Sequence, residues 1–299
     1  MISQSHTLSG PAFAMAKLRA LIELLKVRLS MLVAFSCAFG YALATRGSVQ
    51  WEVLLMLTFG GFLMSGASSC INQILERDYD KLMSRTQNRP LPTGRVSMNE
   101  ATWMALTCLA LSLVILWIYT NPLTLVLSVV SMILYSFVYT PLKRVGPIAV
   151  FVGAFPGALP PLLGWIAATG TISHEALIIF GIQFIWQFPH FWAIAWVADE
   201  DYKKAGFKLL PSGGGKDLNT AIQIMIYTLF LIPLGLLPAT FGITGINSAV
   251  VVTLCGAAFL AQTFTLMKTG SRASALRIMF GSFIYLPIVQ IAYLLDKVG

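Results

Sequence analysis

Long, nearly unbroken runs of hydrophobic residues dominate the chain, and short polar segments separate them. A typical run, TLVLSVVSMILYSF at 124–137, shows no alternation of polar and apolar positions. A helix that crosses a bilayer needs about 20 mostly apolar residues. Nine stretches meet this requirement: 27–45, 52–73, 101–119, 122–141, 148–168, 174–197, 218–240, 246–268 and 275–295. Since the strands of membrane barrels alternate in polarity, we predict an all-α polytopic membrane protein with nine transmembrane helices.

The composition excludes other classes of protein. Of the 299 residues, 57% are hydrophobic and only 11% are charged, whereas soluble domains carry roughly 25% charged residues. A soluble enzyme, a disordered chain and a disulfide-stapled secreted domain are therefore excluded. We predict a single membrane domain over residues 1–299, with residues 1–20 as a flexible cytoplasmic tail.

The basic residues predict the orientation in the membrane. The formal net charge is +8, from 20 Lys and Arg against 12 Asp and Glu. If the N-terminus is cytoplasmic, 18 of the basic residues fall in inner segments, and only Arg46 and Lys297 lie outside. This distribution follows the positive-inside rule. It predicts a multi-pass protein of the cell (inner) membrane with a cytoplasmic N-terminus, and it requires no nucleic acid as a partner.

Two inner loops, 74–98 and 198–217, are longer than the others and hold most of the acidic residues. Each loop follows a hydrophobic stretch, and four spans separate the two. We therefore predict a four-helix unit that is used twice, with a ninth helix appended. The fifth span contains Pro156, Pro160 and Pro161, which predict a kink or a break in that helix.

The first of these loops carries the strongest chemical signal. Asn72, Glu76 and Asp80 are spaced four residues apart and line one face if the second helix continues through them. Carboxylates at the end of a membrane helix are costly without a counterion, and Mg²⁺ takes oxygen ligands that substrate phosphates complete. Arg85 and Arg89 follow, and guanidinium groups suit phosphate oxygens. The spacing alone supports two interpretations equally. One is a site for a metal-bound diphosphate, and the other is a surface helix stabilised by ion pairs.

The second loop is less specific. It holds Asp199, Glu200 and Asp201, followed by Lys203 and Lys204. A second Mg²⁺ with phosphate-binding lysines is one interpretation of this cluster. A solvated charged loop is the interpretation that the residues alone favour.

The stretch NQILERDYDKLMSRTQNRPLPTGRV at 72–96 resembles the first aspartate-rich motif of the UbiA-type intramembrane prenyltransferases. The matching positions are Asn72, Asp80, Arg85, Thr86, Arg89, Pro90 and Leu91. Gln73 and Glu76 stand where the broad pattern has Asp. Those departures, together with segments 139–144, 186–192 and 201–206, resemble the heme O synthase branch of the family, the protoheme IX farnesyltransferases. The resemblance runs from about residue 20 to the C-terminal helix.

The resemblance implies a Mg²⁺-dependent transfer from farnesyl diphosphate to the 2-vinyl group of heme B, with addition of water, at an active site that faces the cytoplasm. The implied metal ligands are Asn72, Glu76, Asp80, Asp199 and Asp201. The implied diphosphate-binding residues are Lys26, Arg85, Arg89, Lys143, Arg144 and Lys203. The implied catalytic residues are Asn72, Glu76, Asp80, His190 and Asp201. Further implied partners are the lipid bilayer and a downstream heme A synthase or terminal oxidase.

Three interpretations of His190 stay open. It is a hydrogen-bonded interior residue, an axial heme ligand, or an acid–base group near the acceptor. Other functions also stay open at this point. They are a related enzyme with an aromatic acid or quinone precursor as acceptor, a secondary transporter, and a structural subunit. Transporter sites tend to lie near the bilayer midplane, whereas the charges here cluster at the inner boundary. This placement favours an enzyme.

Overall fold

The computed structural model describes residues 10–298, and the regular elements of this part are all helices. In chain order they are α1 (Gly10–Leu24), α2 (Val27–Ala44), α3 (Trp51–Asp80), α4 (Met98–Tyr119), α5 (Pro122–Ile133), the π-helix η1 (Leu134–Tyr139), α6 (Thr140–Leu142), α7 (Ile148–Thr169), α8 (His174–Val197), α9 (Asp199–Lys204), α10 (Pro211–Gly214), α11 (Leu218–Thr240), α12 (Ile246–Thr269) and α13 (Arg272–Leu295). Within residues 10–298, nine segments are long and apolar enough to cross a membrane, the fourth being α5, η1 and α6 together. The prediction of nine transmembrane helices is confirmed.

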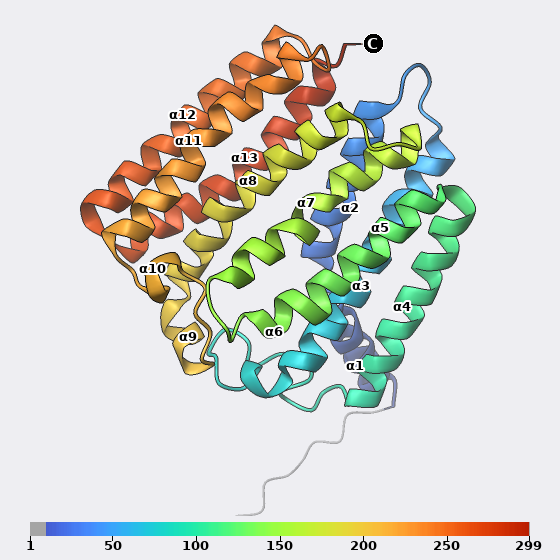
Figure 1. Cartoon of the computed structure of the whole chain (residues 1–299). Coiled ribbons are helices and arrows are strands. Elements are labelled where there is room, and N and C mark those ends of the chain that lie inside the picture. Colours follow the sequence, from blue (N-terminus) through green and yellow to red (C-terminus); the bar gives the residue numbers. More distant parts are fainter. Residues whose placement is uncertain (1–9, 299) are drawn as a thin grey trace, which may run out of the picture.

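The helices form one bundle around the central pair α2 and α7 (Figure 1). α3, α4 and α5 lie on one side of this pair, and α8, α11, α12 and α13 lie on the other. α3 packs between α2 and α4, and α8 packs in the same way between α7 and α11. Both α3 and α8 lead directly into a charged segment. This order of contacts fits the predicted four-helix unit used twice, with α13 as the ninth helix.

α7 runs as one helix from Ile148 to Thr169, so the break expected from its prolines does not occur. Pro161 lacks an N–H group, which leaves the carbonyl of Gly157 without its helical partner. The side-chain amide of Gln183 on α8 donates to that carbonyl at 2.8 Å. A neighbouring helix therefore supplies the missing hydrogen bond, as membrane helices with internal prolines require.

α2 and α7 approach each other closely through glycines. A Cβ atom added to Gly40 would overlap the backbone carbonyl of Pro161, and one added to Gly164 would overlap that of Cys37. Small residues at such crossings allow two backbones to pack directly against each other in a membrane. The contact fixes the centre of the bundle.

Residues 10–20, predicted as part of a flexible tail, belong instead to α1, while residues 1–9 lie outside the described part. Two ion pairs hold α1 against the start of α4 and the loop that precedes it. Lys17 contacts Glu100 at 2.7 Å, and Arg95 contacts Glu23 at 2.8 Å. These partners are more than 70 residues apart in sequence, which is why the hydrophobic pattern alone did not reveal the helix.

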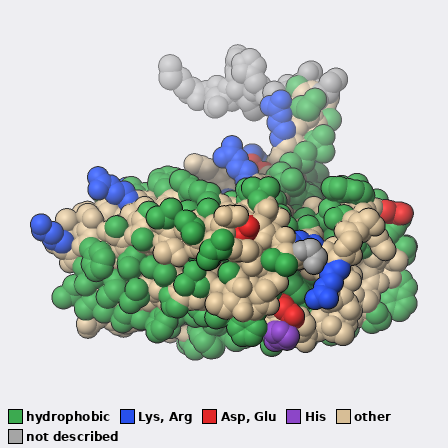
Figure 2. Space-filling view, turned by 90° about the horizontal axis from the view of Figure 1, so that it is seen from above, with side chains coloured by type: hydrophobic (Ala, Val, Ile, Leu, Met, Phe, Trp, Pro, Cys, Tyr) green, Lys and Arg blue, Asp and Glu red, His purple; other side chains and the backbone are tan. Residues whose placement is uncertain are grey.

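The charged segments gather at one end of the bundle. α1, the segment 81–97, α9 and α10 all lie at the lower end in Figure 1. At the opposite end, Lys297 donates to the backbone carbonyl of Ala42, close to the link between α2 and α3. Hydrophobic side chains cover most of the face shown in Figure 2, and charged ones are scattered singly over it. The sorting of basic residues to one end follows the sequence prediction, and the cytoplasmic location of that end stays a prediction.

Candidate active site

A cavity of about 500 Å³ lies inside the bundle, between α2, α3, η1, α7, α8 and α13. Most of its lining is apolar. Its charged lining residues all come from segments at the charged end of the molecule: Lys26, Glu76, Asp80, Arg85, Arg89 and Lys143. Four cations against two carboxylates give this end a formal charge of +2 with both lysines protonated. An excess of positive charge along one end of a cavity predicts an anionic ligand.

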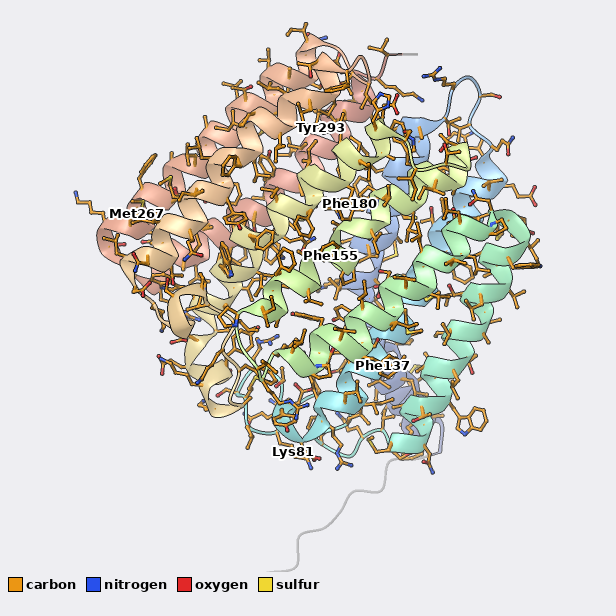
Figure 3. The ribbon with its side chains drawn as sticks, viewed as in Figure 1. Lys81, Phe137, Phe155, Phe180, Met267 and Tyr293 are labelled. Carbon is orange, nitrogen blue, oxygen red and sulfur yellow. The ribbon has the colours of Figure 1, made fainter. Side chains whose placement is uncertain are left out.

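α3 supplies the acidic side of the site. The helix continues without interruption to Asp80, so Asn72, Glu76 and Asp80 share one face, and all three are buried. Figure 3 labels Lys81, the next residue, at the charged end of the bundle. The prediction that the helix continues through the motif is confirmed.

Each polar group on this face of α3 contacts a cation from another segment. Lys143, between α6 and α7, contacts Glu76 at 2.8 Å. One guanidinium nitrogen of Arg89 donates to both oxygens of Asp80, at 2.8 and 2.7 Å. Burial disfavours the charged form of Lys143, but Glu76 outweighs this effect and raises the lysine pKa. The two carboxylates thus already hold cations in place.

The π-helix η1 orients Asn72. The Thr140 hydroxyl donates to the Tyr135 carbonyl at 2.9 Å, and the amide nitrogen of Asn72 donates to the same hydroxyl at 3.1 Å. The amide oxygen of Asn72 therefore points toward Lys26, which donates to it at 3.1 Å. π-helical turns are frequent at functional sites. No feature of the sequence analysis predicted this π-helical turn.

Lys26 lies at the sharp junction between α1 and α2. Its backbone is left-handed, with φ 46° and ψ 54°, a conformation that is uncommon outside glycine. The side chain of Gln73 donates to the Leu24 carbonyl at 2.7 Å and so supports the junction. Burial lowers the pKa of Lys26 to about 7, and Arg89 and Lys143 act in the same direction. Gln73, one of the departures from the broad motif, thus has a structural contact on the side of α3 away from the cavity.

The loop after α3 is fastened to α9 by Asp201. The Asp201 carboxylate accepts the backbone N–H of Arg85 at 3.0 Å and the ammonium of Lys204 at 2.9 Å. Lys204 also donates to the Ser84 hydroxyl at 3.1 Å. The hydrogen bond from Lys204 holds the pKa of Asp201 well below its usual range. Asp201 therefore fixes the backbone from which Arg85 reaches the cavity.

Three further predicted residues, Asp199, Lys203 and Arg144, lie outside the main cavity. Asp199 and Lys203 line a separate cavity of about 140 Å³, where Asp199 contacts Lys203 at 2.9 Å and Lys216 at 3.2 Å. Arg144 donates to the Tyr79 hydroxyl at 2.6 Å. Within residues 10–298, no three His, Cys, Asp or Glu side chains lie close enough together to hold a metal ion by themselves.

The far part of the cavity is apolar, with a few buried amides. His190 of α8 lines it, about 10 Å along the helix from Val197 at the charged end. Gln290 of α13 donates to Gln183 at 2.9 Å and to the Ser36 hydroxyl at 3.1 Å. Sequence reasoning missed these glutamines, although polar amides inside apolar helices are themselves an indication of function.

The fold and the cavity together define a class of protein. It is an all-helical, multi-pass membrane protein in which a positively charged site, suited to an anion, lies at one end of an apolar cavity. The chain belongs to the UbiA prenyltransferase family, whose model matches residues 33–286. A protein of Cytophaga hutchinsonii named protoheme IX farnesyltransferase is 53% identical over 95% of this chain and 99% of its own length. A protein of the same name from Christiangramia forsetii is 45% identical to this chain, over 92% of this chain and 92% of its own length.

Two solved structures share the fold. A digeranylgeranylglyceryl phosphate synthase superposes with a TM-score of 0.77 at 22% identity, over 94% of this chain and 98% of its own. A UbiA homolog from Archaeoglobus fulgidus bound to GPP and Mg²⁺ superposes with a TM-score of 0.61 at 18% identity, over 93% of this chain and 99% of its own. Membership of a prenyltransferase family removes the transporter and the structural subunit from the functions left open by the sequence.

Proposed function

We propose that this chain transfers the farnesyl group of farnesyl diphosphate to the 2-vinyl group of heme B, with addition of water, and so makes heme O. The observation that carries the proposal is the cluster of two buried carboxylates, one buried amide and four cations at one end of an apolar cavity. An allylic diphosphate matches both the charged cluster and the apolar cavity, because it joins a highly charged head to a hydrocarbon tail. The names of the relatives at 45–53% identity support heme as the acceptor.

The donor set on α3 fits Mg²⁺. Asn72, Glu76 and Asp80 offer only oxygen atoms, and they are too few to complete an octahedral shell, so the phosphates of the substrate would supply further ligands. Bound there, Mg²⁺ would neutralise charge on the diphosphate as it leaves. The Mg²⁺ bound with GPP in the Archaeoglobus fulgidus homolog supports this assignment. Asp199 and Asp201 each hold lysines, and we assign them to fixing the second loop rather than to a second metal.

The protein's own cations would stabilise the leaving group. Lys26, Arg89 and Lys143 are held in place by their contacts with α3, and together with Arg85 they line the space that the diphosphate would occupy. Cleavage of the bond between C1 and oxygen leaves the electron pair on diphosphate and an allylic cation on the farnesyl chain. Fixed positive charges favour this separation because they need no reorganisation.

The acceptor completes the reaction in the apolar part of the cavity. The terminal carbon of the vinyl group bonds to farnesyl C1, which leaves a cation next to the porphyrin ring. Water adds to that carbon and loses a proton, giving a hydroxyethylfarnesyl side chain. We place the charged end of the bundle, with its site, at the cytoplasmic face of the inner membrane. A heme A synthase or a terminal oxidase would then use the product.

A mass spectrum of extracted heme tests the proposal. The protein, in mild detergent, receives heme B, farnesyl diphosphate and Mg²⁺. We expect heme to gain the mass of a farnesyl group plus water, and to lose this gain with a chelator or in Asp80→Asn. Asp78→Asn is the matched control, because Asp78 lies two residues before Asp80 on the same helix but is exposed and pairs with Arg77 and Lys81 instead of facing the cavity.

The outcomes separate the alternatives. Unmodified heme, together with release of pyrophosphate when an aromatic acid is supplied, would replace heme by another acceptor. Full activity in the presence of chelator would refute the metal assignment and leave the acceptor unaffected. Loss of activity in Asp78→Asn as well would show that the effect of Asp80→Asn is not specific to the site.

A further inference from the structure

His190 has a hydrogen-bond partner that fixes the position of its proton. Its Nδ1 atom lies 2.8 Å from the hydroxyl of Ser282 on α13. The same hydroxyl donates to the backbone carbonyl of Met279 at 2.7 Å. A serine hydroxyl has a single proton, and the Met279 carbonyl can only accept, so both contacts are hydrogen bonds only when that proton goes to Met279. Ser282 must therefore accept from His190, so Nδ1 carries the hydrogen and Nε2 carries the free electron pair.

Aromatic rings hold the imidazole in this orientation. Trp186 stacks on it with the ring centres 4.3 Å apart and the planes 19° apart. Phe283 of α13 and Phe191 of α8 meet it edge-on, at 5.1 and 5.3 Å. All four side chains line the main cavity. Within the described residues, Nε2 has no hydrogen-bond partner, so it is the polar atom that this wall offers to a ligand.

The surroundings favour a metal ligand over a proton acceptor. The groups that face the imidazole are Trp186 and Phe191 from its own helix, and Ser282 and Phe283 from α13. None of them is a carboxylate, so an imidazolium formed here would be a buried charge without a counterion. A neutral imidazole that donates Nδ1–H to a fixed acceptor is, in contrast, the usual arrangement of a histidine that ligates a metal.

We propose that Ser282 is a positioning residue that fixes the Nδ1–H form of His190, and that Nε2 of His190 thereby coordinates the iron of the heme substrate. The proposal rests on heme as the acceptor in the proposed function. It adds the way in which the acceptor is held: iron ligation fixes the porphyrin in the apolar cavity, separately from the diphosphate cluster on α3. Ligand identity is among the means by which a protein controls a heme.

Resonance Raman spectroscopy of the ferrous heme complex tests both parts. The intact protein should show an iron–histidine stretching band. His190→Gly should lose it, and added imidazole should restore it. In Ser282→Ala the band should move to lower frequency, because an imidazole that no longer donates Nδ1–H binds iron more weakly. Affinity for heme should fall by about 10- to 100-fold, as is typical when a residue supporting a metal ligand is removed.

Tyr285→Phe is the matched control. It removes a buried hydroxyl from the same helix, one that has no hydrogen-bond partner among residues 10–298 and does not line the cavity. The iron–histidine band should be unchanged in this variant. Ser282→Thr restores a hydroxyl and should return the band toward the wild-type frequency, which a purely structural role of Ser282 would not require.

Each result has a definite consequence. Absence of the band in the wild-type complex, or its persistence in His190→Gly, would overturn ligation by His190. An unshifted band in Ser282→Ala would overturn the role of Ser282 alone. If the band is present but no farnesyl is transferred, the proposed function fails while heme ligation stands. If farnesyl is transferred but the iron–histidine band is absent, ligation by His190 fails while the proposed function stands.

Discussion

The ion pair between Glu76 and Lys143 allows the structural and the catalytic roles of charge in this site to be separated. The two side chains are 7% and 12% exposed, and their charged atoms are 2.8 Å apart. Removal of one member of a buried pair typically costs about 3–5 kcal/mol, because the other charge is left uncompensated. We expect Lys143→Met to destabilise the protein by about this amount. Glu76→Gln keeps an acceptor oxygen and should cost about 1.5–3 kcal/mol.

The double variant Glu76→Gln, Lys143→Met removes both charges together. Its stability should return to within about 1–2 kcal/mol of the wild type, since replacement of a whole buried pair is often nearly neutral. Farnesyl transfer should be lost in all three variants, because each lacks the proposed metal ligand, the proposed phosphate-binding cation, or both. Only the double variant is thus expected to combine nearly wild-type stability with a loss of farnesyl transfer.

Thermal unfolding in detergent, at one fixed heating rate, measures the stability part. At roughly 2 °C per kcal/mol for a chain of this size, Lys143→Met should lower the midpoint by roughly 6–10 °C, and the double variant should recover most of the loss. The heme mass spectrum measures the activity part. A double variant as unstable as Lys143→Met would refute the pairing argument. A double variant that transfers farnesyl would refute the assignment of Glu76 as a metal ligand.

Two further predictions concern the pH dependence and the core of the bundle. Lys26 has a pKa near 7 in the free protein, and an anion favours its protonated form. Affinity for pyrophosphate, measured calorimetrically without metal, should therefore be highest below pH 7 and fall by up to about tenfold per pH unit above it. Gly40→Ala should destabilise the bundle by about 1–3 kcal/mol or more, because its Cβ would overlap the Pro161 carbonyl. Gly181→Ala on α8, where nothing lies within 4 Å of the added carbon, should be neutral or slightly stabilising.

Both predictions have internal controls. Pyrophosphate itself titrates, so the contribution of Lys26 is the difference between the wild type and Lys26→Met. Identical pH profiles in the two proteins would show that Lys26 is not the group responsible. Equal unfolding midpoints for Gly40→Ala and Gly181→Ala would contradict the close approach of α2 and α7.

The acidic face of α3 could be predicted because helical periodicity is a local property. Asn72, Glu76 and Asp80 lie on one face of any helix that includes all three. Their partners could not be predicted in the same way. Lys26 is 46 residues from Asn72, and Lys143 is 67 residues from Glu76. Only the packing of several helices brings these groups together.

The tertiary structure also gives different contacts to residues that are similar in type and close together in the sequence. Lys143 and Arg144 are neighbours, yet Lys143 lines the main cavity while Arg144 turns to Tyr79. Asp199 and Lys203, separated by one helical turn, contact each other at a different cavity. A charge near a motif is thus a poor guide to its contacts, since side chains only one or two positions apart project in different directions from a helix.

The number of membrane helices, the sorting of charge to one end and the face that Asn72, Glu76 and Asp80 share on α3 could all be predicted from the sequence. These follow from hydropathy, the distribution of Lys and Arg, and the helical repeat, all of which can be read along the chain. The tertiary structure decided which cation meets which carboxylate, how Gln183 completes α7, and which nitrogen of His190 carries the hydrogen. That last choice depends on Ser282, 92 residues away, because a proton's position is set by the partner that packing brings within hydrogen-bond distance.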